Sequence, residues 1–409
     1  MHLTAVLTLT ASLALSGTAV AADRAQLKCR QIEVPVALAE GRPADQTIVG
    51  DLCEPTGFAF GGGPTTIELL VHGITYNAGY WSTPDPTGGT DRYNYVAHAL
   101  HAGFATLAID RLGSTRSSKP PSTELTIDSN AYTVHQVVQA IRSGAITRSD
   151  GARFTKVVYV GHSYGTWTGW FEVGRYNDVD AAVFTAASSK GAPTALANAM
   201  GSLYPAASDP KFSGQGLDPG YLTTLPGRRY TAFYAPAEAD PGVVQHDEDT
   251  KSTVTASELE NFRDILTKQQ DIRVPVFLVA GADDSLFCRE NFGNEQLNQA
   301  AQPAEDKTLP ETGDSTGLRF GGTRCDSAED LIGDEREHLG PHVPSIDAFI
   351  LPGAGHDLNQ AMRAPEFFDA TQAWIRRHVT TRVPHLFAMG SSGDIHDQAK
   401  GRREEIRSP

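Results

Sequence analysis

The sequence predicts an α/β fold with a mostly parallel central sheet, helices on both faces and an inserted cap. After residue 71, short apolar runs alternate with helical runs, which is typical of a parallel sheet whose faces are both covered. Residues 190–270 interrupt this rhythm between two predicted core strands and are rich in Pro, Gly, Tyr and Ala. The chain has 409 residues, of which 40% are hydrophobic and 20% charged, so it can bury a sizeable core.

The N-terminal segment, residues 1–22, has the pattern of a secretory signal peptide. An apolar run extends from Leu3 to about Leu15, and small residues follow at Ala19, Ala21 and Ala22. A buried or membrane helix is the alternative, but the run is shorter than the ~20 apolar residues that a span needs. We therefore expect removal of this segment and an extracellular or periplasmic location. No later segment is apolar enough to span a bilayer.

The chain contains four cysteines, Cys29, Cys53, Cys288 and Cys325. Export places them in an oxidising compartment, where an even number favours two disulfides. We expect Cys29 to pair with Cys53 and Cys288 with Cys325, because each pair lies close in sequence. Four free, buried thiols are the alternative, and metal binding is disfavoured because no C-x-x-C pair is present.

Strands open the predicted first part of the core, residues 23–189. The runs QIEVPVAL, QTIVGDLCEP and TTIELLVHG alternate with turn signals between residues 27 and 71, which predicts antiparallel strands. The glycines at 61–63, followed by Pro64, are expected to form a hairpin turn. A phosphate-binding loop is disfavoured there, because no helix and no lysine with serine or threonine follow.

The later elements alternate between helices and strands. The predicted helices are 92–103, 131–144, the residues from Ser163 through Trp170, and 367–379. The predicted strands are 104–110, 156–161, 180–188, 274–281 and 345–353. The second part of the core is expected at 271–388, with a helix and a disulfide-pinned excursion between residues 286 and 345. The polar tail, 389–409, is expected to be disordered.

One serine stands between two glycines at the switch from a strand to a helix. The stretch Gly161-His162-Ser163-Tyr164-Gly165 matches G-x-S-x-G, the nucleophile elbow, and follows the apolar run VVYV. Such a turn holds the serine in a strained backbone conformation, and the glycines leave room for strand and helix to approach. The pattern predicts Ser163 as a nucleophile.

A serine hydroxyl needs a base, and the base needs an orienting carboxylate. The strand VPVFLVA runs into Asp283 and Asp284, and the strand IDAFILP runs into His356. We assign His356 as the base and Asp284, three residues after Gly281, as the acid. Asp283 remains the alternative acid.

An oxyanion hole needs two backbone N–H donors directed at the charge that develops on the carbonyl oxygen. We expect one from Tyr164, which follows the nucleophile, and one from Ile74, in the loop after ELLVHG. Thr75 is the alternative to Ile74. His72, just before this loop, is expected to have a structural role rather than to act as a base.

The motifs HGI, DRLG, GHSYG, GADD and GAGHD together resemble those of the α/β-hydrolase superfamily, in particular its secreted serine esterases and lipases. The resemblance covers roughly residues 67–189 and 274–379. It implies hydrolysis of an ester, thioester or amide through an acyl-enzyme, without a cofactor or a metal. The segment DRLGSTRSS departs from the usual pattern at Thr115 and Arg116, and Asp110 before it is expected to be structural.

Aromatic residues on the oxyanion loop and in the predicted cap suggest a substrate with an apolar or aromatic acyl group. Those on the loop are Tyr76, Tyr80 and Trp81, which we predict to bind substrate; those in the cap are Tyr221, Tyr230, Phe233 and Tyr234. The alternative, that they pack the cap against the core, stays open. Trp167 and Trp170 are expected in the core.

Charge and histidine spacing disfavour other partners. The net charge of −15 argues against binding to nucleic acid or to an anionic membrane surface. Glu335, His338 and His342 are expected on a surface loop rather than at a metal, because prolines interrupt that segment. The acidic run at 246–249 is expected to be a solvated face rather than a calcium site.

The sequence as a whole predicts a secreted serine hydrolase that cleaves carboxylic esters of small molecules. An exopeptidase or amidase with the same triad is one alternative. A catalytically silent binding protein is another, although binding would need none of the triad residues. The sequence does not predict the oligomeric state.

Overall fold

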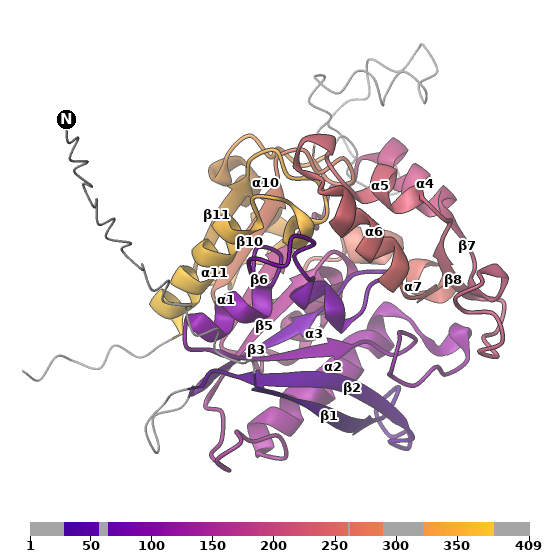
Figure 1. The fold of residues 1–409 in the computed structure, drawn as a ribbon. Helices are drawn as coiled ribbons and strands as arrows, with labels where there is room; N and C mark the ends of the chain where they lie inside the picture. Colours follow the sequence, from indigo (N-terminus) through magenta and orange to yellow (C-terminus); the bar gives the residue numbers. More distant parts are fainter. Residues whose placement is uncertain (1–27, 57–63, 261, 289–321, 380–409) are drawn as a thin grey trace, which may run out of the picture.

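A computed structural model describes residues 28–56, 64–260, 262–288 and 322–379 (Figure 1). The predicted signal peptide, the glycine turn at 61–63 and the predicted polar tail lie outside the described residues. Within the described ranges, no helix combines the length and the hydropathy needed to cross a membrane.

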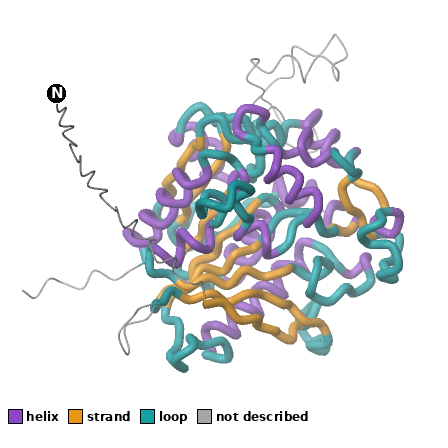
Figure 2. Tube along the Cα trace, viewed as in Figure 1, coloured by secondary structure: helices purple, strands orange, loops and turns teal. Residues whose placement is uncertain are grey.

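Eight strands of the described chain form one central sheet (Figures 1 and 2). They are β1 (Lys28–Val36), β2 (Gln46–Glu54), β3 (Thr66–Val71), β4 (Ala105–Asp110), β5 (Lys156–His162), β6 (Ala181–Thr185), β10 (Val276–Gly281) and β11 (Ile346–Leu351). Their order across the sheet is β1-β2-β4-β3-β5-β6-β10-β11. All neighbours from β4 to β11 are parallel, whereas β1 with β2 and β2 with β4 are antiparallel. The predicted mostly parallel sheet is therefore confirmed.

The strand β3 differs from the prediction. Its sequence was expected to belong to the antiparallel opening of the sheet, but β3 pairs in parallel with both β4 and β5. All six of its residues, TIELLV, are buried. A strand that is covered on both faces shows no alternation of polar and apolar residues, as is usual in the interior of a parallel sheet.

Helices cover both faces of the central sheet (Figure 1). On one face, α1 (Tyr95–His101) packs against α11 (Ala364–His378); on the other, α2 (Ile127–Ser143) packs against α3 (Tyr164–Tyr176). A further helix, α10 (Ala328–Leu339), lies beside β11 and reaches α3, where the rings of Trp170 and His338 are 4.4 Å apart. Trp167 and Trp170 are buried, as expected.

The segment predicted as a cap, residues 190–270, lies between β6 and β10 in the chain. Its helices are α4 (Pro193–Gly201), α5 (Arg228–Phe233), α6 (Pro241–Thr250), α7 (Ala256–Glu260) and α8 (Phe262–Thr267). Its three strands, β7 (Leu203–Pro205), β8 (Tyr221–Thr224) and β9 (Val254–Thr255), form a second, antiparallel sheet. Short 3-10 helices complete the described elements: η1 (Ala78–Ser82), η2 (Ser122–Glu124), η3 (Ala206–Ser208), η4 (Pro236–Glu238) and η6 (Leu358–Gln360).

Both disulfides join the cysteines that are close in sequence. The Cys29–Cys53 bond links β1 to β2, and the Cys288–Cys325 bond links the turn after β10 to the residues before α10. The helix α10 provides the helix that was expected between residues 286 and 345.

The interpretation of Glu335 and His338 as parts of a surface loop is wrong. Both lie in α10 and are buried; only His342 is exposed, and it pairs with Asp271. The Glu335 carboxylate accepts hydrogen bonds from Ser188 Oγ, at 2.6 Å, and from Ser189 N–H. The helix forms because Ser327 caps its first turn and because Pro341 and Pro344 lie beyond its end.

Candidate active site

Ser163 lies in a strained turn between β5 and α3. Its backbone angles are φ 54° and ψ −120°, a region that residues other than glycine rarely adopt. Position 165, two residues after the serine, has to be glycine, since a Cβ on Gly165 would clash with the carbonyl oxygen of Val71 in β3. The turn thus brings the start of α3 against the end of β3.

The structure brings Ser163, His356 and Asp284 together in a hydrogen-bonded chain. His356 Nε2 lies 2.9 Å from Ser163 Oγ, and His356 Nδ1 lies 3.0 Å from Asp284 Oδ2. All three residues are buried. With the imidazole proton on Nδ1, this nitrogen donates to the carboxylate and Nε2 accepts from the serine hydroxyl. This is the geometry of a nucleophile, a base and an orienting acid.

The two aspartates after β10 occupy different environments. Asp284 is buried, and its Oδ1 also accepts the N–H of Leu286 at 2.9 Å, which fixes the carboxylate in the turn. Asp283, the alternative acid, is exposed. The partner of His356 is therefore Asp284, the residue that the G-x-x-D spacing favours.

The surroundings of His356 favour its protonated form. Burial opposes a charged imidazolium, but the carboxylate of Asp284, aided by that of Asp357, outweighs this effect and raises the pKa of His356 above its ordinary value. The imidazolium that forms when His356 accepts a proton is therefore stabilised, as general base catalysis requires.

The loop after β3 lies directly against the nucleophile. A Cβ built on Gly73 would be 2.9 Å from the Cβ of Ser163, so the backbone at this point can approach the serine only because the residue is glycine. Ile74 follows in this loop, and Tyr164 is the first residue of α3. Both backbone N–H groups expected to form the oxyanion hole therefore come from residues next to this close approach.

His72 connects the oxyanion loop to the loop after β4. Its Nδ1–H donates to Gly73 O at 2.8 Å, and its Nε2 accepts the N–H of Arg111 at 3.0 Å. Burial, together with the charge of Arg111, lowers the pKa of His72 well below its ordinary value, so the ring is neutral. These contacts are those of the structural role that was expected.

Asp110 also has structural contacts. One carboxylate oxygen accepts the N–H of Ala78 at 2.7 Å, which holds the start of η1, and the other accepts from Nε of Arg116 at 2.7 Å. Arg116 also forms a paired contact with Asp51 in β2. The departure from the usual motif at Arg116 thus supplies the partner of the buried Asp110.

The three aromatic residues predicted to bind substrate are buried around the site. Trp81 packs against Tyr80 of η1 and Tyr95 of α1. Tyr80 stacks on His162 with ring centres 4.3 Å apart, and its hydroxyl lies 3.1 Å from His162 Nδ1. Tyr76 donates a hydrogen bond to Asp357.

Three other rings surround the imidazole of His356. Their centres lie 5.1 Å away for His162, 5.6 Å for Phe287 and 5.7 Å for Phe233. Phe233 was among the cap aromatics noted in the sequence, but Phe287 and His162 were missed. Only their positions in the sequence could have identified them, since His162 precedes the nucleophile and Phe287 lies three residues after the acid.

A buried ionic network lies beneath the oxyanion loop. Arg229 of α5 makes two hydrogen bonds of 2.7 Å to Asp247 of α6, and its guanidinium lies 4.3 Å from the ring centre of Tyr76. The interpretation of the acidic run at 246–249 as a solvated face is wrong for Asp247, which is buried as this partner of Arg229. Burial, with the nearby charge of Asp247, raises the pKa of Asp357 to about 7.

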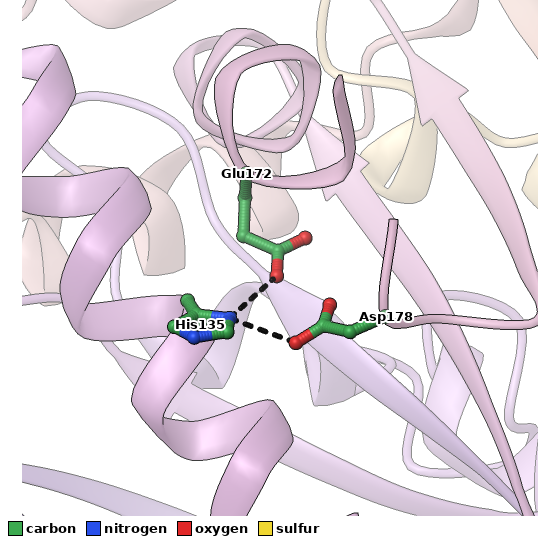
Figure 3. Close-up of side chains that lie close together, drawn as sticks. All are labelled: His135, Glu172 and Asp178. Atoms are coloured by element: carbon green, nitrogen blue, oxygen red, sulfur yellow. Dashed lines mark hydrogen bonds and ion pairs between the residues drawn. The ribbon is translucent and has the colours of Figure 1, made fainter. Parts of the chain in front are cut away.

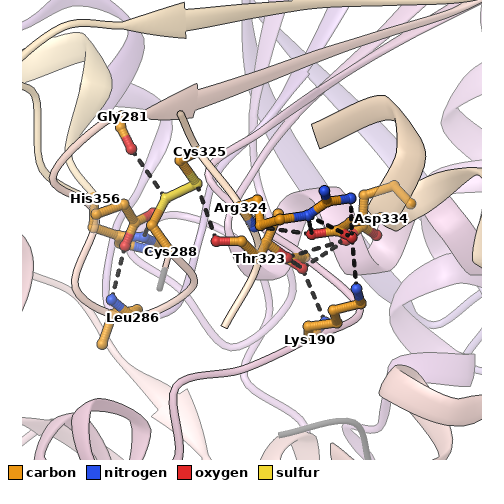
Figure 4. The surroundings of a disulfide bond; sticks show 12 residues. Lys190, Gly281, Leu286, Cys288, Thr323, Arg324, Cys325, Asp334 and His356 are labelled. Atoms are coloured by element: carbon orange, nitrogen blue, oxygen red, sulfur yellow. Dashed lines mark hydrogen bonds and ion pairs between the residues drawn. A yellow bond between two sulfur atoms is a disulfide. The ribbon is translucent and has the colours of Figure 1, made fainter. Parts of the chain in front are cut away.

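The second disulfide, Cys288–Cys325, holds the turn that carries Asp284. Figure 4 shows the surroundings of this disulfide, with His356 close by. Cys288 N–H donates to Asp284 O at 2.9 Å, and Thr323 N–H donates to Phe287 O at 2.6 Å. The Cys288–Cys325 bond thus joins this turn to the segment that leads into α10. Beyond it, Asp334 pairs with Lys190 and Arg324.

Comparisons with known proteins agree with this architecture. A family model described as the alpha/beta hydrolase family matches residues 69–371. A comparison with curated proteins found no significant match.

Similar solved structures are an enol-lactonase from Burkholderia xenovorans, an alpha/beta hydrolase fold protein from Chitinophaga pinensis and the esterase domain of a Rhodothermus marinus protein. Their sequence identities are 14%, 13% and 13%, and their TM-scores are 0.47, 0.46 and 0.44. The alignments cover 83%, 86% and 86% of this chain, and 99%, 98% and 100% of the other chains.

Proposed function

The chain belongs to the alpha/beta hydrolase family, and from this premise we propose that it is a serine hydrolase that cleaves carboxylic esters. The observation that carries the proposal is the hydrogen-bonded chain from Ser163 Oγ through His356 to Asp284, with distances of 2.9 and 3.0 Å. A serine in an ordinary structural role needs neither a strained backbone nor a histidine that is itself oriented by a buried carboxylate.

The reaction proceeds in two halves on these residues. Ser163 Oγ attacks the carbonyl carbon of the ester while His356 Nε2 takes the hydroxyl proton, and the N–H groups of Ile74 and Tyr164 stabilise the oxyanion. His356 then gives the proton to the leaving alcohol, and an acyl-enzyme remains. Water, deprotonated by His356, attacks the acyl carbon, and collapse of the second tetrahedral intermediate releases the acid and restores the serine.

An apolar or aromatic group on the substrate fits the surroundings of the imidazole. Phe233 and Phe287 both lie against the ring of His356, so apolar carbon borders the reacting atoms. Apolar substrate groups gain free energy when they leave water for such surroundings. The substrate is therefore a small ester with an apolar or aromatic part.

The enzyme acts outside the cytoplasm after loss of residues 1–22. The two disulfides, Cys29–Cys53 and Cys288–Cys325, support this location because such bonds persist in oxidising compartments. N-terminal sequencing of the exported protein tests it, and a mature chain that still begins at Met1 contradicts it.

Turnover of a substrate panel tests the activity. Purified mature protein is assayed with p-nitrophenyl esters of increasing acyl length and with aminoacyl anilides, each beside Ser163→Ala. Ester hydrolysis that is lost in Ser163→Ala is the expected result. Hydrolysis of the anilides alone would replace the esterase by a peptidase or amidase, and turnover that persists in Ser163→Ala would remove the proposed nucleophile.

A further inference from the structure

A second group of titratable side chains lies outside the candidate active site, between α2 and α3 (Figure 3). It consists of His135 from α2, Glu172 from α3 and Asp178 from the loop before β6. Glu172 is nine residues after Ser163 on the helix that the nucleophile begins, which corresponds to about 13 Å along the helix axis. None of the three takes part in the proposed reaction.

The polar atoms of the three side chains lie close together. His135 Nδ1 lies 2.8 Å from Asp178 Oδ2 and 3.9 Å from Glu172 Oε1. One donor atom from each residue can be chosen so that all lie within 4.8 Å of one another. Among the residues that the structure describes, this is the single group of three with such spacing.

Glu172 is the unusual member of the group. It is fully buried, and neither of its carboxylate oxygens has a hydrogen-bond partner; Asp178 Oδ1 also has none. An isolated buried carboxylate costs several kcal/mol unless a positive charge or a donor compensates it. Two ionised carboxylates offer no donor to each other, so a proton or a cation has to lie between them.

We propose that His135, Glu172 and Asp178 bind a divalent transition-metal cation, with Zn²⁺ as the best fit. One imidazole nitrogen with two carboxylates is a ligand set typical of zinc, whereas calcium and magnesium favour oxygen ligands alone. Zinc places such ligand atoms about 2 Å from the ion, hence roughly 3 to 4 Å from one another. The distances from His135 Nδ1, 2.8 Å to Asp178 Oδ2 and 3.9 Å to Glu172 Oε1, are close to that range.

The surroundings of the group suit a bound cation. The side chains of His135 and Asp178 are 19% and 15% exposed, which gives an ion a route from solvent. Gln139 Nε2 donates to Asp178 Oδ2 at 2.7 Å, and Tyr176 stacks on His135 with ring centres 3.7 Å apart. Contacts of this kind orient metal ligands.

The competing state is a proton held by Glu172. Burial, with the adjacent charge of Asp178, raises the pKa of Glu172 well above its ordinary value, so a neutral Glu172 can donate to Asp178 when no ion is bound. Zinc then displaces this proton. Binding would link α2, α3 and the loop before β6, and would stabilise the fold by mass action.

Zinc binding to the mature, chelator-treated protein tests the proposal. The measurements are the zinc content after dialysis and the change of Tm with added Zn²⁺, Ca²⁺ or Mg²⁺. We expect one Zn²⁺ per chain and a rise in Tm with Zn²⁺ that exceeds the rise with the other two ions. His135→Ala and Asp178→Asn should each weaken zinc binding at least ~10-fold, as loss of a ligand does.

His98→Ala is the matched control, because His98 pairs with a single carboxylate, that of Asp369, and should leave zinc binding unchanged. Glu172→Gln keeps the shape of the side chain, so it separates loss of zinc from loss of the fold: we expect a folded, zinc-free protein whose Tm no longer responds to Zn²⁺. No zinc in the wild type, or equal zinc in His135→Ala, would show that a proton alone neutralises the group and would overturn the proposal.

Discussion

Arg229 Nη1 donates a hydrogen bond of 2.8 Å to the hydroxyl of Thr75. Thr75 has a φ of 55°, uncommon for a β-branched residue, and it follows Ile74 in the loop that lies against Ser163. Its carbonyl oxygen also accepts the N–H of Ser252 at 2.7 Å. Two contacts from residues 190–270 therefore hold the loop that carries one of the proposed oxyanion donors.

Removal of Arg229 should affect both stability and turnover. Arg229→Met leaves Asp247 buried without its partner, and this change should destabilise the fold by about 3 to 5 kcal/mol. Arg229→Met/Asp247→Leu removes the unpaired charge and should recover most of that loss in urea unfolding. Because Thr75 still lacks the hydrogen bond from Arg229, kcat of the double variant should stay roughly 10- to 100-fold below that of the wild type. A double variant with wild-type stability and wild-type kcat would show that the loop does not depend on the hydrogen bond from Arg229.

The two aspartates after β10 should differ sharply in their effect on turnover. Asp284→Asn removes the charge that orients and stabilises the His356 imidazolium, so kcat should fall by about 10³- to 10⁴-fold. Asp283→Asn is the matched control, since Asp283 is exposed one residue away. Steady-state kinetics of both variants decides the assignment, and a larger loss in Asp283→Asn would transfer the acid role.

The pH dependence of kcat/KM should report the titration of His356. The base has to be neutral, so activity falls as the pH drops through the pKa of His356, which lies above the ordinary value of about 6.5. Asp357 contributes to this rise after Asp284, and Asp357→Asn should therefore move the acid limb to lower pH. Asp283→Asn serves again as the control. An acid limb that stays in place in Asp357→Asn would show that this carboxylate does not act on the base.

Removal of the two disulfides should have different effects on kcat. Loops of 24 and 37 residues are closed by Cys29–Cys53 and Cys288–Cys325, so by chain entropy each bond stabilises the fold by about 3 to 4 kcal/mol. Cys288→Ser/Cys325→Ser also releases the turn that carries Asp284 and Phe287, and should lower kcat at a temperature where the protein remains folded. Cys29→Ser/Cys53→Ser is the control, with reduced Tm and unchanged kcat. Equal kcat in both double variants would contradict the coupling to the active site.

The sequence was informative where local chemistry is distinctive. The turn at Ser163 and the placement of Asp284 and His356 after β10 and β11 follow from strand ends and residue types, which are visible in a single sequence. The parallel pairing of β3 was missed because pairing depends on which strands lie beside it. A buried six-residue run does not specify the direction of its neighbours.

The buried charges were less predictable. Asp247 is part of an acidic run, and its burial depends on Arg229, which is 18 positions earlier in another helix. Glu172 and His135 come together only because α2 packs against α3. Neither pairing leaves a regular spacing in the sequence, and a charge is assigned to the surface by default unless its partner is known.

Labelling with a fluorophosphonate probe tests the central claim most directly. The mature protein is treated with the probe, digested and analysed by mass spectrometry, with His356→Ala treated in parallel. We predict one adduct, on Ser163, formed rapidly in the wild type and at least ~10²-fold more slowly in His356→Ala, because the hydroxyl is nucleophilic only beside its base. An unmodified Ser163, or equal labelling of both proteins, would contradict an activated serine at this site.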